Sequence, residues 1–190
     1  RFERLLEDLL EISRFDAEVA VLEPVEFDFC NLVSKSIEDL RMVASEAGIH
    51  IELARPADSI YIKGDIRRIE RIMRNLLTNA IDHADGKPIN VSIKGDQSAV
   101  AVSVRDHGIG LDKESALRVF DRFWRADPSR SRIRGGTGLG LSMALEDARL
   151  HNGELEVYGE PGRGANFVLT LPLQAGGEIP QRIIRSEEHT

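Results

Sequence analysis

Hydrophobic positions recur at helical spacing in four segments of the chain. The clearest runs over residues 66–83, where one face is apolar and Asp65 stands where an N-cap is needed. A second helix is predicted over residues 31–47, with Gly48 as its C-terminal cap. Two shorter helices are predicted over residues 113–119 and 141–151. The apolar face of the first helix comprises Ile69, Ile72, Met73, Leu76, Leu77 and Ala80.

Other segments alternate between apolar and polar residues, which is typical of strands with one buried face. Residues 89–94 and 100–105 flank a turn at 95–98 and are predicted to pair. Further strands are predicted over residues 25–29, 49–53, 59–63, 154–158 and 166–171. Helices interspersed with such strands predict an α+β fold, a two-layer α/β sandwich in which helices cover one face of a mixed sheet and the other face is open.

The first residues carry a separate helical pattern. Their apolar positions follow steps of three, four and three, which predicts a coiled-coil-like seam suited to a bundle or a dimer contact. The seam consists of Phe2, Leu5, Leu9 and Ile12. Because Pro24 ends any helix begun there, we expect this helix in residues 1–23, one domain in residues 24–173 and a disordered tail in residues 174–190.

Composition narrows the class of protein. A chain of 190 residues with 42% hydrophobic residues can form one substantial domain. Twenty-five basic against 32 acidic residues, a net charge of −7, disfavour nucleic acid as the partner. The single cysteine, Cys30, fits a reducing compartment, and no signal peptide or apolar run of membrane-spanning length is present. Because the chain starts at Arg1 without Met, we expect a fragment, which leaves room for a membrane anchor upstream.

A glycine run at residues 135–141 carries the strongest chemical signal. Each of its glycines would cost a helix interior about 1 kcal/mol relative to Ala, so the run is predicted to be a loop that enters the following helix. Such a loop offers free N–H groups and the positive end of a helix dipole to phosphate. The glycine spacing matches neither a Walker A loop nor the Rossmann fingerprint.

Two polar motifs precede this loop. Asn75 and Asn79 are four residues apart on the long helix, with His83 in the same row, so their amide oxygens suit Mg²⁺ and its waters. For an isolated pair of this kind, a solvated polar face is the favoured interpretation. Asp106, followed by Gly108 and Gly110, can accept a hydrogen bond from an exocyclic amine while the glycines let the backbone approach a flat ligand; an ordinary turn is the alternative.

In their order these motifs resemble the ATP-binding domain of sensor histidine kinases, in the GHKL superfamily. The resemblance covers residues 24–173 and implies the Bergerat ATP-binding fold. Residues 5–15 resemble the end of the second helix of the dimerisation and phosphoacceptor domain. The matching motifs are residues 75–80 (N box), 106–110 (G1), 120–125 (F box), 136–140 (G2), and Gly162 and Gly164 before the last strand.

The resemblance implies a role for each motif. Asp106 is expected to hold the adenine amine beside Ile109, and Asn79 to coordinate Mg²⁺. Asn75, on the phosphate side, and Arg125, reaching the γ-phosphate, are the expected catalytic residues. The expected ATP-binding residues are Asn75, Asn79, His83, Asp106, Gly108, Ile109, Gly110, Arg125, Arg130, Gly136, Thr137, Gly138, Leu139 and Gly140. An acid at Asp82, where the family often has Lys or Arg, is expected to shift phosphate charge to the arginines Arg125, Arg130 and Arg132.

The resemblance also implies partners. Residues 123–130 and 146–151 resemble the MtrB-type subfamily most, which implies an MtrA-like response regulator. A homodimer and a membrane-anchored parent with this domain in the cytoplasm are expected as well. No histidine of the chain has the phosphoacceptor context, so the fragment is expected to bind ATP without phosphorylating itself and to need its own phosphoacceptor helix.

Two other functions are left open by the motifs. A GHKL ATPase would need a glutamate base one turn before the metal-binding residue, and Asn75 stands there. An anti-sigma-like protein-serine kinase or a binding module would not need the dimerisation seam of residues 1–23.

Overall fold

The computed structural model describes residues 21–125, 137–179 and 183–184. Residues 1–20 of the predicted seam helix (1–23) and residues 126–136 lie outside the described residues, and residues 21–23 are not helical. The elements, in chain order, are β1 (Val25–Asp28), α2 (Phe29–Asp39), α3 (Arg41–Glu46), β2 (Ile51–Ala54), β3 (Tyr61–Gly64), α4 (Ile66–His83), β4 (Ile89–Gly95), β5 (Ala99–Asp106), α5 (Lys113–Arg118), α6 (Gly140–Leu150), β6 (Glu154–Gly159) and β7 (Ala165–Pro172).

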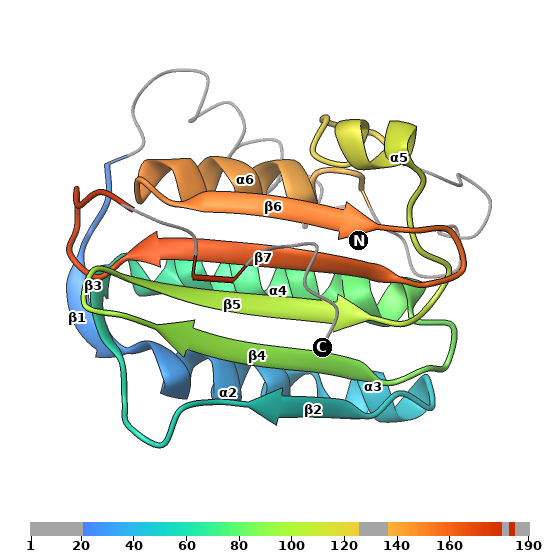
Figure 1. Cartoon of the computed structure of the whole chain (residues 1–190), viewed down its shortest axis with the longest axis horizontal. Helices are drawn as coiled ribbons and strands as arrows, with labels where there is room; N and C mark the ends of the chain where they lie inside the picture. Colours follow the sequence, from blue (N-terminus) through green and yellow to red (C-terminus); the bar gives the residue numbers. More distant parts are fainter. Residues whose placement is uncertain (1–20, 126–136, 180–182, 185–190) are drawn as a thin grey trace.

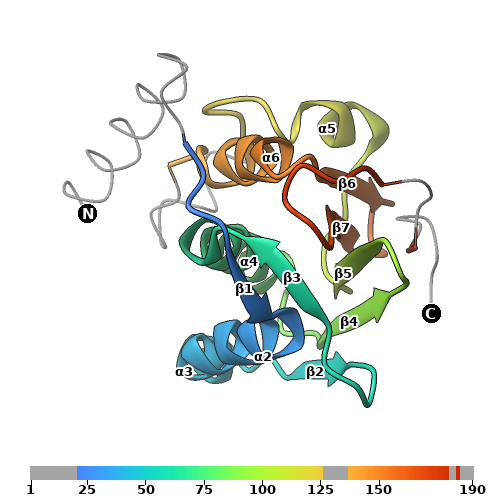
Figure 2. The same cartoon turned by 90° about the vertical axis from the view of Figure 1, so that its left-hand side faces the viewer.

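The strands form a five-stranded sheet with the order β2-β4-β5-β7-β6. Strands β2 and β4 are parallel and the other pairs are antiparallel, so the sheet is mixed. Helices α2, α4 and α6 lie in one layer on one face of the sheet (Figures 1 and 2). Strands β1 and β3 pair separately as a two-stranded antiparallel sheet. This architecture confirms the predicted α+β fold.

Helix α4 lies at the centre of the helix layer. Its predicted bounds and its N-cap are confirmed: the Asp65 Oδ1 accepts the Arg68 N–H at 3.2 Å. The helix is followed at once by Asp85 and Gly86, both with positive φ, so the chain turns there. Every residue of its predicted apolar face is at most 2% exposed, and Ile81 joins them. These side chains pack on the core face of the sheet, where Val91, Val104 and Phe167 lie in register.

The predicted helix over residues 31–47 is wrong in two respects. It starts earlier, at Phe29, because the Asp28 Oδ1 accepts the N–H groups of Cys30 and Asn31. It is also interrupted at Leu40, whose φ of −103° and ψ of 2° leave the helical region before α3 begins. No Gly or Pro marks this break in the sequence, so the apolar spacing runs through it without a signal.

The second face of the sheet carries part of the C-terminal segment. Ile184 is 4% exposed and packs on Ala101 and Val168, with Ile183 partly buried beside it. The disordered tail stays a prediction for residues 180–182 and 185–190, which lie outside the described residues. At Ile184, however, the face that the sequence predicted to be open is covered.

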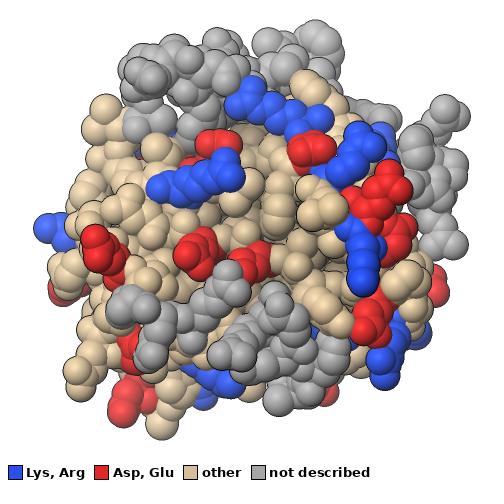
Figure 3. Space-filling view, turned by 45° about the horizontal axis from the view of Figure 1, so that its top comes forward, with Lys and Arg blue, Asp and Glu red and all other residues tan. Residues whose placement is uncertain are grey.

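The described surface mixes both signs of charge. On the face seen in Figure 3, Lys and Arg side chains lie among Asp and Glu side chains. The described helices are all too short or too polar to cross a bilayer.

We predict that Ile184→Ser lowers the free energy of unfolding by about 1.5 kcal/mol, the cost of losing one buried aliphatic side chain. Urea denaturation followed by circular dichroism measures it. Ile183→Ser is the matched control and should cost less, because Ile183 is only partly buried. Equal or negligible effects of the two substitutions would show that Ile184 contributes no packing to the sheet.

Candidate functional site

The site is built around a buried carboxylate at the end of a central strand. Asp106 is the last residue of β5 and is 1% exposed. Its Oδ1 accepts the Gly108 N–H at 3.0 Å and its Oδ2 accepts the Ala165 N–H at 3.3 Å. Burial raises the pKa of Asp106, while these two hydrogen bonds, followed by the nearby charges of His83 and Arg105, oppose the rise. Each oxygen retains acceptor capacity, so the carboxylate can still bind a donor group on a ligand.

Glycines allow three backbone segments to meet beside this carboxylate. A Cβ at Gly108 would overlap the His83 carbonyl oxygen, and one at Gly110 would overlap the Glu160 carbonyl oxygen. A Cβ at Gly164 would overlap the Asp106 carbonyl oxygen. These glycines therefore admit the close approach of other backbone segments, and the expectation that Gly108 and Gly110 also make room for a flat ligand stays a prediction.

Ile109 joins the same three segments through its backbone. Its N–H donates to the His83 carbonyl at 3.2 Å, and its carbonyl accepts the Gly162 N–H at 2.8 Å. The segment after β5 is thus held between the C-terminus of α4 and the turn between β6 and β7. The side chain of His107, which directly follows Asp106, is fixed as well, by a 2.7 Å hydrogen bond between its Nε2 and the Asn90 Oδ1. Burial and then the charge of Arg105 lower the pKa of His107.

The polar row on α4 runs along one side of the site. Asn75, Asn79 and His83 are partly exposed, whereas the apolar face of the helix is buried. At one end of the row, the Asn75 Oδ1 lies 3.1 Å from the position of a Cβ on Gly140. At the other end, His83 lies close enough to lower the pKa of Asp106 electrostatically. The row therefore connects the glycine loop with the buried carboxylate.

The described end of the glycine loop leads directly into α6. Gly138 has a φ of +74°, and Leu139, which is fully buried, is the N-cap residue. The Leu139 N–H donates a weak 3.4 Å hydrogen bond to the Thr137 Oγ1. Within the described residues, no side chain of the N-cap residue bonds to the first turn of α6. A helix start without a side-chain cap is suited to an anion, and the phosphate site that the sequence interpretation assigns to it stays a prediction.

The two sides of the loop over residues 124–137 are joined at its base. The Phe123 N–H donates to the Gly138 carbonyl at 2.9 Å, and Phe123 has a φ of 64°, which is rare for a bulky residue. A Cβ at Gly138 would lie 2.9 Å from the Phe123 Cα, so only glycine fits there without a shift. Arg125 is partly buried, and its Nη2 is shielded from solvent without a hydrogen-bond partner in the described part of the chain. Arg130 and Gly136 lie outside the described residues.

The structure therefore brings half of the fourteen predicted site residues into three contacts. Asn75 meets Gly140, His83 meets the segment of Asp106, Gly108 and Ile109, and the F box meets Gly138. Sequence reasoning did not assign Ala165 to the site, although its N–H holds Asp106. The available signal was the glycine pair at 162 and 164, which matched the family pattern without a role attached.

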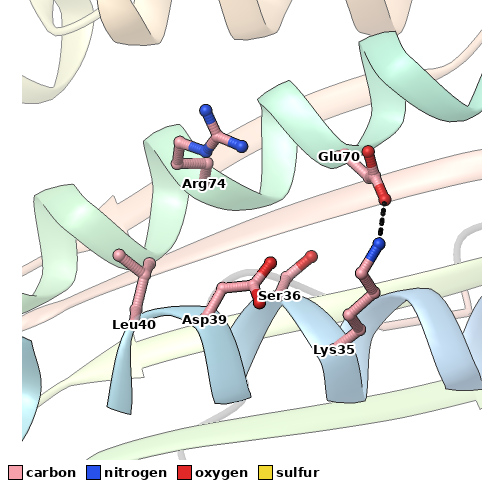
Figure 4. Close-up of a pocket in the computed structure, with 6 residues that line it drawn as sticks. All are labelled: Lys35, Ser36, Asp39, Leu40, Glu70 and Arg74. Atoms are coloured by element: carbon pink, nitrogen blue, oxygen red, sulfur yellow. Dashed lines mark hydrogen bonds and ion pairs between the residues drawn. The ribbon is translucent and has the colours of Figure 1, made fainter. Parts of the chain in front are cut away.

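A separate groove lies between α2 and α4 (Figure 4). Six residues line it, and none of them is a predicted site residue. The Lys35 Nζ reaches across to the Glu70 Oε1 at 3.3 Å. The lining residues are Lys35, Ser36, Asp39, Leu40, Glu70 and Arg74.

The donor set beside the glycine loop fits a magnesium ion that is held mainly by its substrate. Within the described residues, no three His, Cys, Asp or Glu side chains converge as a metal cage. Mg²⁺ commonly keeps one or two protein ligands and completes its shell with phosphate oxygens and water. The amide oxygen of Asn79 can serve as such a ligand.

The sequence of the chain is similar to those of known ATP-binding proteins. The family model described as "Histidine kinase-, DNA gyrase B-, and HSP90-like ATPase" matches residues 64–175, which include every predicted site residue. The sensor histidine kinase MtrB of Mycobacterium leprae is 52% identical over 179 residues, which are 94% of this chain and 32% of that protein. The chain therefore spans about a third of the length of this curated relative.

Solved structures are similar as well. Full-length ShkA in complex with AMPPNP aligns with a TM-score of 0.81 and 27% identity over 94% of this chain and 37% of that chain. The histidine kinase ThkA in complex with the response regulator TrrA aligns with a TM-score of 0.74 over 92% of this chain and 49% of that chain. At 22% identity, the second similarity shows the fold alone.

The glycine contacts predict different costs for two neighbouring glycines. Gly162 and Gly164 have φ of +79° and +76°, so Ala costs about 1–2 kcal/mol of backbone strain at either. Only Gly164 faces backbone atoms, those of Asp106, whereas nothing lies within 4 Å of a Cβ at Gly162. We expect Gly164→Ala to cost about 1–3 kcal/mol more than Gly162→Ala in thermal unfolding. Equal costs would show that the close approach to Asp106 relaxes freely.

The raised pKa of Asp106 predicts the sign of a pH dependence. Because the folded pKa lies above the ordinary 3.8, the stability contributed by this group is complete below that pH and is lost as the pH rises through the folded pKa. Asn cannot titrate, so the unfolding free energy of Asp106→Asn minus that of the wild type should increase from pH 4 to pH 7.

Asp112→Asn provides the opposite control for this measurement. Hydrogen bonds from Ser115 lower the pKa of Asp112, so its difference from the wild type should decrease as the pH rises. A decrease at Asp106 as well would contradict the burial effect.

Proposed function

Because the chain belongs to the family of histidine kinase-, DNA gyrase B- and HSP90-like ATPases and is the ATP-binding catalytic domain of a two-component sensor histidine kinase, we propose that it delivers the γ-phosphate of ATP to a histidine outside these 190 residues. The observation that carries the proposal is the continuous path from Asp106, along the polar row of α4, to the glycine loop at Gly140. This path has an acceptor for an amine at one end and free N–H groups for phosphate at the other.

The base of the nucleotide binds at the Asp106 end of this path. One carboxylate oxygen accepts the exocyclic amine of adenine while both oxygens stay bonded to the N–H groups of Gly108 and Ala165. Those two hydrogen bonds fix the carboxylate before the ligand arrives, so binding orders few further groups. Ile109 lies against the base, since its backbone is held on both sides.

The triphosphate lies between the row on α4 and the start of α6. Asn75 contacts the phosphates, and Asn79 holds Mg²⁺ through its amide oxygen. A bound magnesium ion would supply positive charge that neutralises the phosphates. The first N–H groups of α6 and the Arg125 guanidinium, whose Nη2 has no hydrogen-bond partner in the described residues, supply further donors.

This arrangement positions phosphate rather than activating water. Transfer of a phosphoryl group depends mainly on alignment and charge neutralisation. An ATPase would need a carboxylate base one turn before the metal-binding amide, and this position is occupied by Asn75, which cannot take a proton from water. We therefore favour transfer to a protein histidine over steady hydrolysis.

The partners follow from this reaction. The acceptor histidine belongs to the phosphoacceptor helix of a longer parent, and that parent acts as a membrane-anchored homodimer. The phosphohistidine then passes its phosphoryl group to a response regulator. An MtrA-like regulator is the specific candidate, in view of the 52% identity to an MtrB kinase.

Titration with AMPPNP, with and without Mg²⁺, tests the proposal through the fluorescence of Trp124, the only tryptophan. We expect a saturable change that is stronger with Mg²⁺. Asn79→Ala should remove most of the Mg²⁺ dependence, whereas the exposed control Asn31→Ala should behave as the wild type. Absence of binding would contradict the proposal. Steady ATP hydrolysis that is abolished by Asn79→Ala would favour the ATPase instead.

A further inference from the structure

A buried ion-pair network joins α4 to α6 away from the nucleotide residues. Asp147 on α6 is fully buried, and its two oxygens accept three hydrogen bonds from arginines of α4. Arg71 binds it through both Nε (2.7 Å) and Nη2 (2.8 Å), and Arg68 adds its Nη1 at 3.0 Å. We call the set of Asp65, Arg68, Arg71, Asp147 and His151 the α4–α6 network.

His151 closes the network at the start of α4. Its Nε2 accepts the Asp65 N–H at 3.0 Å, and its Nδ1 donates to the Asp147 carbonyl at 2.7 Å. This pair of bonds requires the neutral ring with the proton on Nδ1. Because Asp65 is also the N-cap of α4, the first turn of α4 and the last turns of α6 are held by one continuous set of hydrogen bonds.

Each of the two helices contains both a residue of the network and a residue of the candidate site. Asp147 follows Gly140 by seven residues, about 10 Å along α6, and Arg71 precedes Asn75 by four residues, about 6 Å along α4. The helices pack side by side between these points (Figure 2). A slide of one helix along the other would therefore move Gly140 relative to Asn75 by the same amount.

We propose that the α4–α6 network fixes the axial position of α6 on α4 and thereby sets the spacing between the glycine loop and the asparagine row. Arg68, Arg71 and Asp147 are then positioning residues for the phosphates, in a role that rests on the proposed function. Apolar side chains could fill the same volume without loss of stability, but they would allow α6 to slide along α4. A bidentate Arg–carboxylate pair instead fixes one position of α6 along α4.

The decisive variant replaces the paired charges by apolar groups. Asp147→Leu combined with Arg71→Met should unfold at a temperature near that of the wild type, because both charges of that pair are removed together and Arg68, which loses Asp147, keeps its ion pair with Asp65 at 3.7 Å. Its Kd for AMPPNP with Mg²⁺, measured by calorimetry, should rise about tenfold to hundredfold, the loss that a misplacement near 1 Å can cause. Wild-type affinity in this folded double variant would overturn the proposal.

A single conservative variant keeps the test valid if the double variant does not fold. Arg71→Lys retains the charge on a partly exposed side chain but loses the two-pronged contact, so its Kd should also rise while the chain stays folded. The control is Val33→Ala, in the buried face of α2, which should lower the unfolding temperature and leave the Kd unchanged. If Arg71→Lys changes the Kd no more than this control does, the network is only structural. Wild-type binding of AMPPNP, measured alongside, tests the proposed function separately.

Discussion

Helix α4 cannot expose its apolar face to water, and the domain is arranged around that constraint. Seven side chains of the helix are at most 2% exposed, so it must lie against the sheet along its whole length. The row of Asn75, Asn79 and His83 lies beside this buried face, so these three side chains are partly exposed. The same packing that stabilises the fold thus places three polar residues at a fixed spacing beside α6 and the end of β5.

The local sequence pattern was sufficient to predict many of the helices and strands of this fold. The bounds of α4 and its cap at Asp65 follow from apolar spacing and from one side-chain hydrogen bond, both of which are readable within a few residues. The pairing of β4 with β5 follows from alternation on either side of a short turn. The break at Leu40 was not predictable, because it arises from backbone geometry without a Gly or Pro.

The sequence was sufficient to predict which residues belong to the candidate site, but not which atoms those residues contact. Asp106 and the glycines could be chosen from residue type and order, but what each glycine faces depends on segments far apart in the chain. Gly164 approaches Asp106 across 58 residues, and Arg71 bonds Asp147 across 76. The sequence alone assigned no role to Asp147, because a single acidic residue on a predicted helix is usually a solvated side chain. Its burial becomes apparent only once the position of α4 is known.

The hydrogen bond between Phe123 and Gly138 has a consequence for how such domains diversify. It joins the two described sides of the segment over positions 124–137, so the chain is held where this segment leaves the domain and where it returns. The entropy of closing a loop grows slowly, by about 0.6 kcal/mol for each doubling of its length. Changes in the length of this segment therefore cost little in closure entropy, so natural variation can lengthen or shorten it while the architecture is kept.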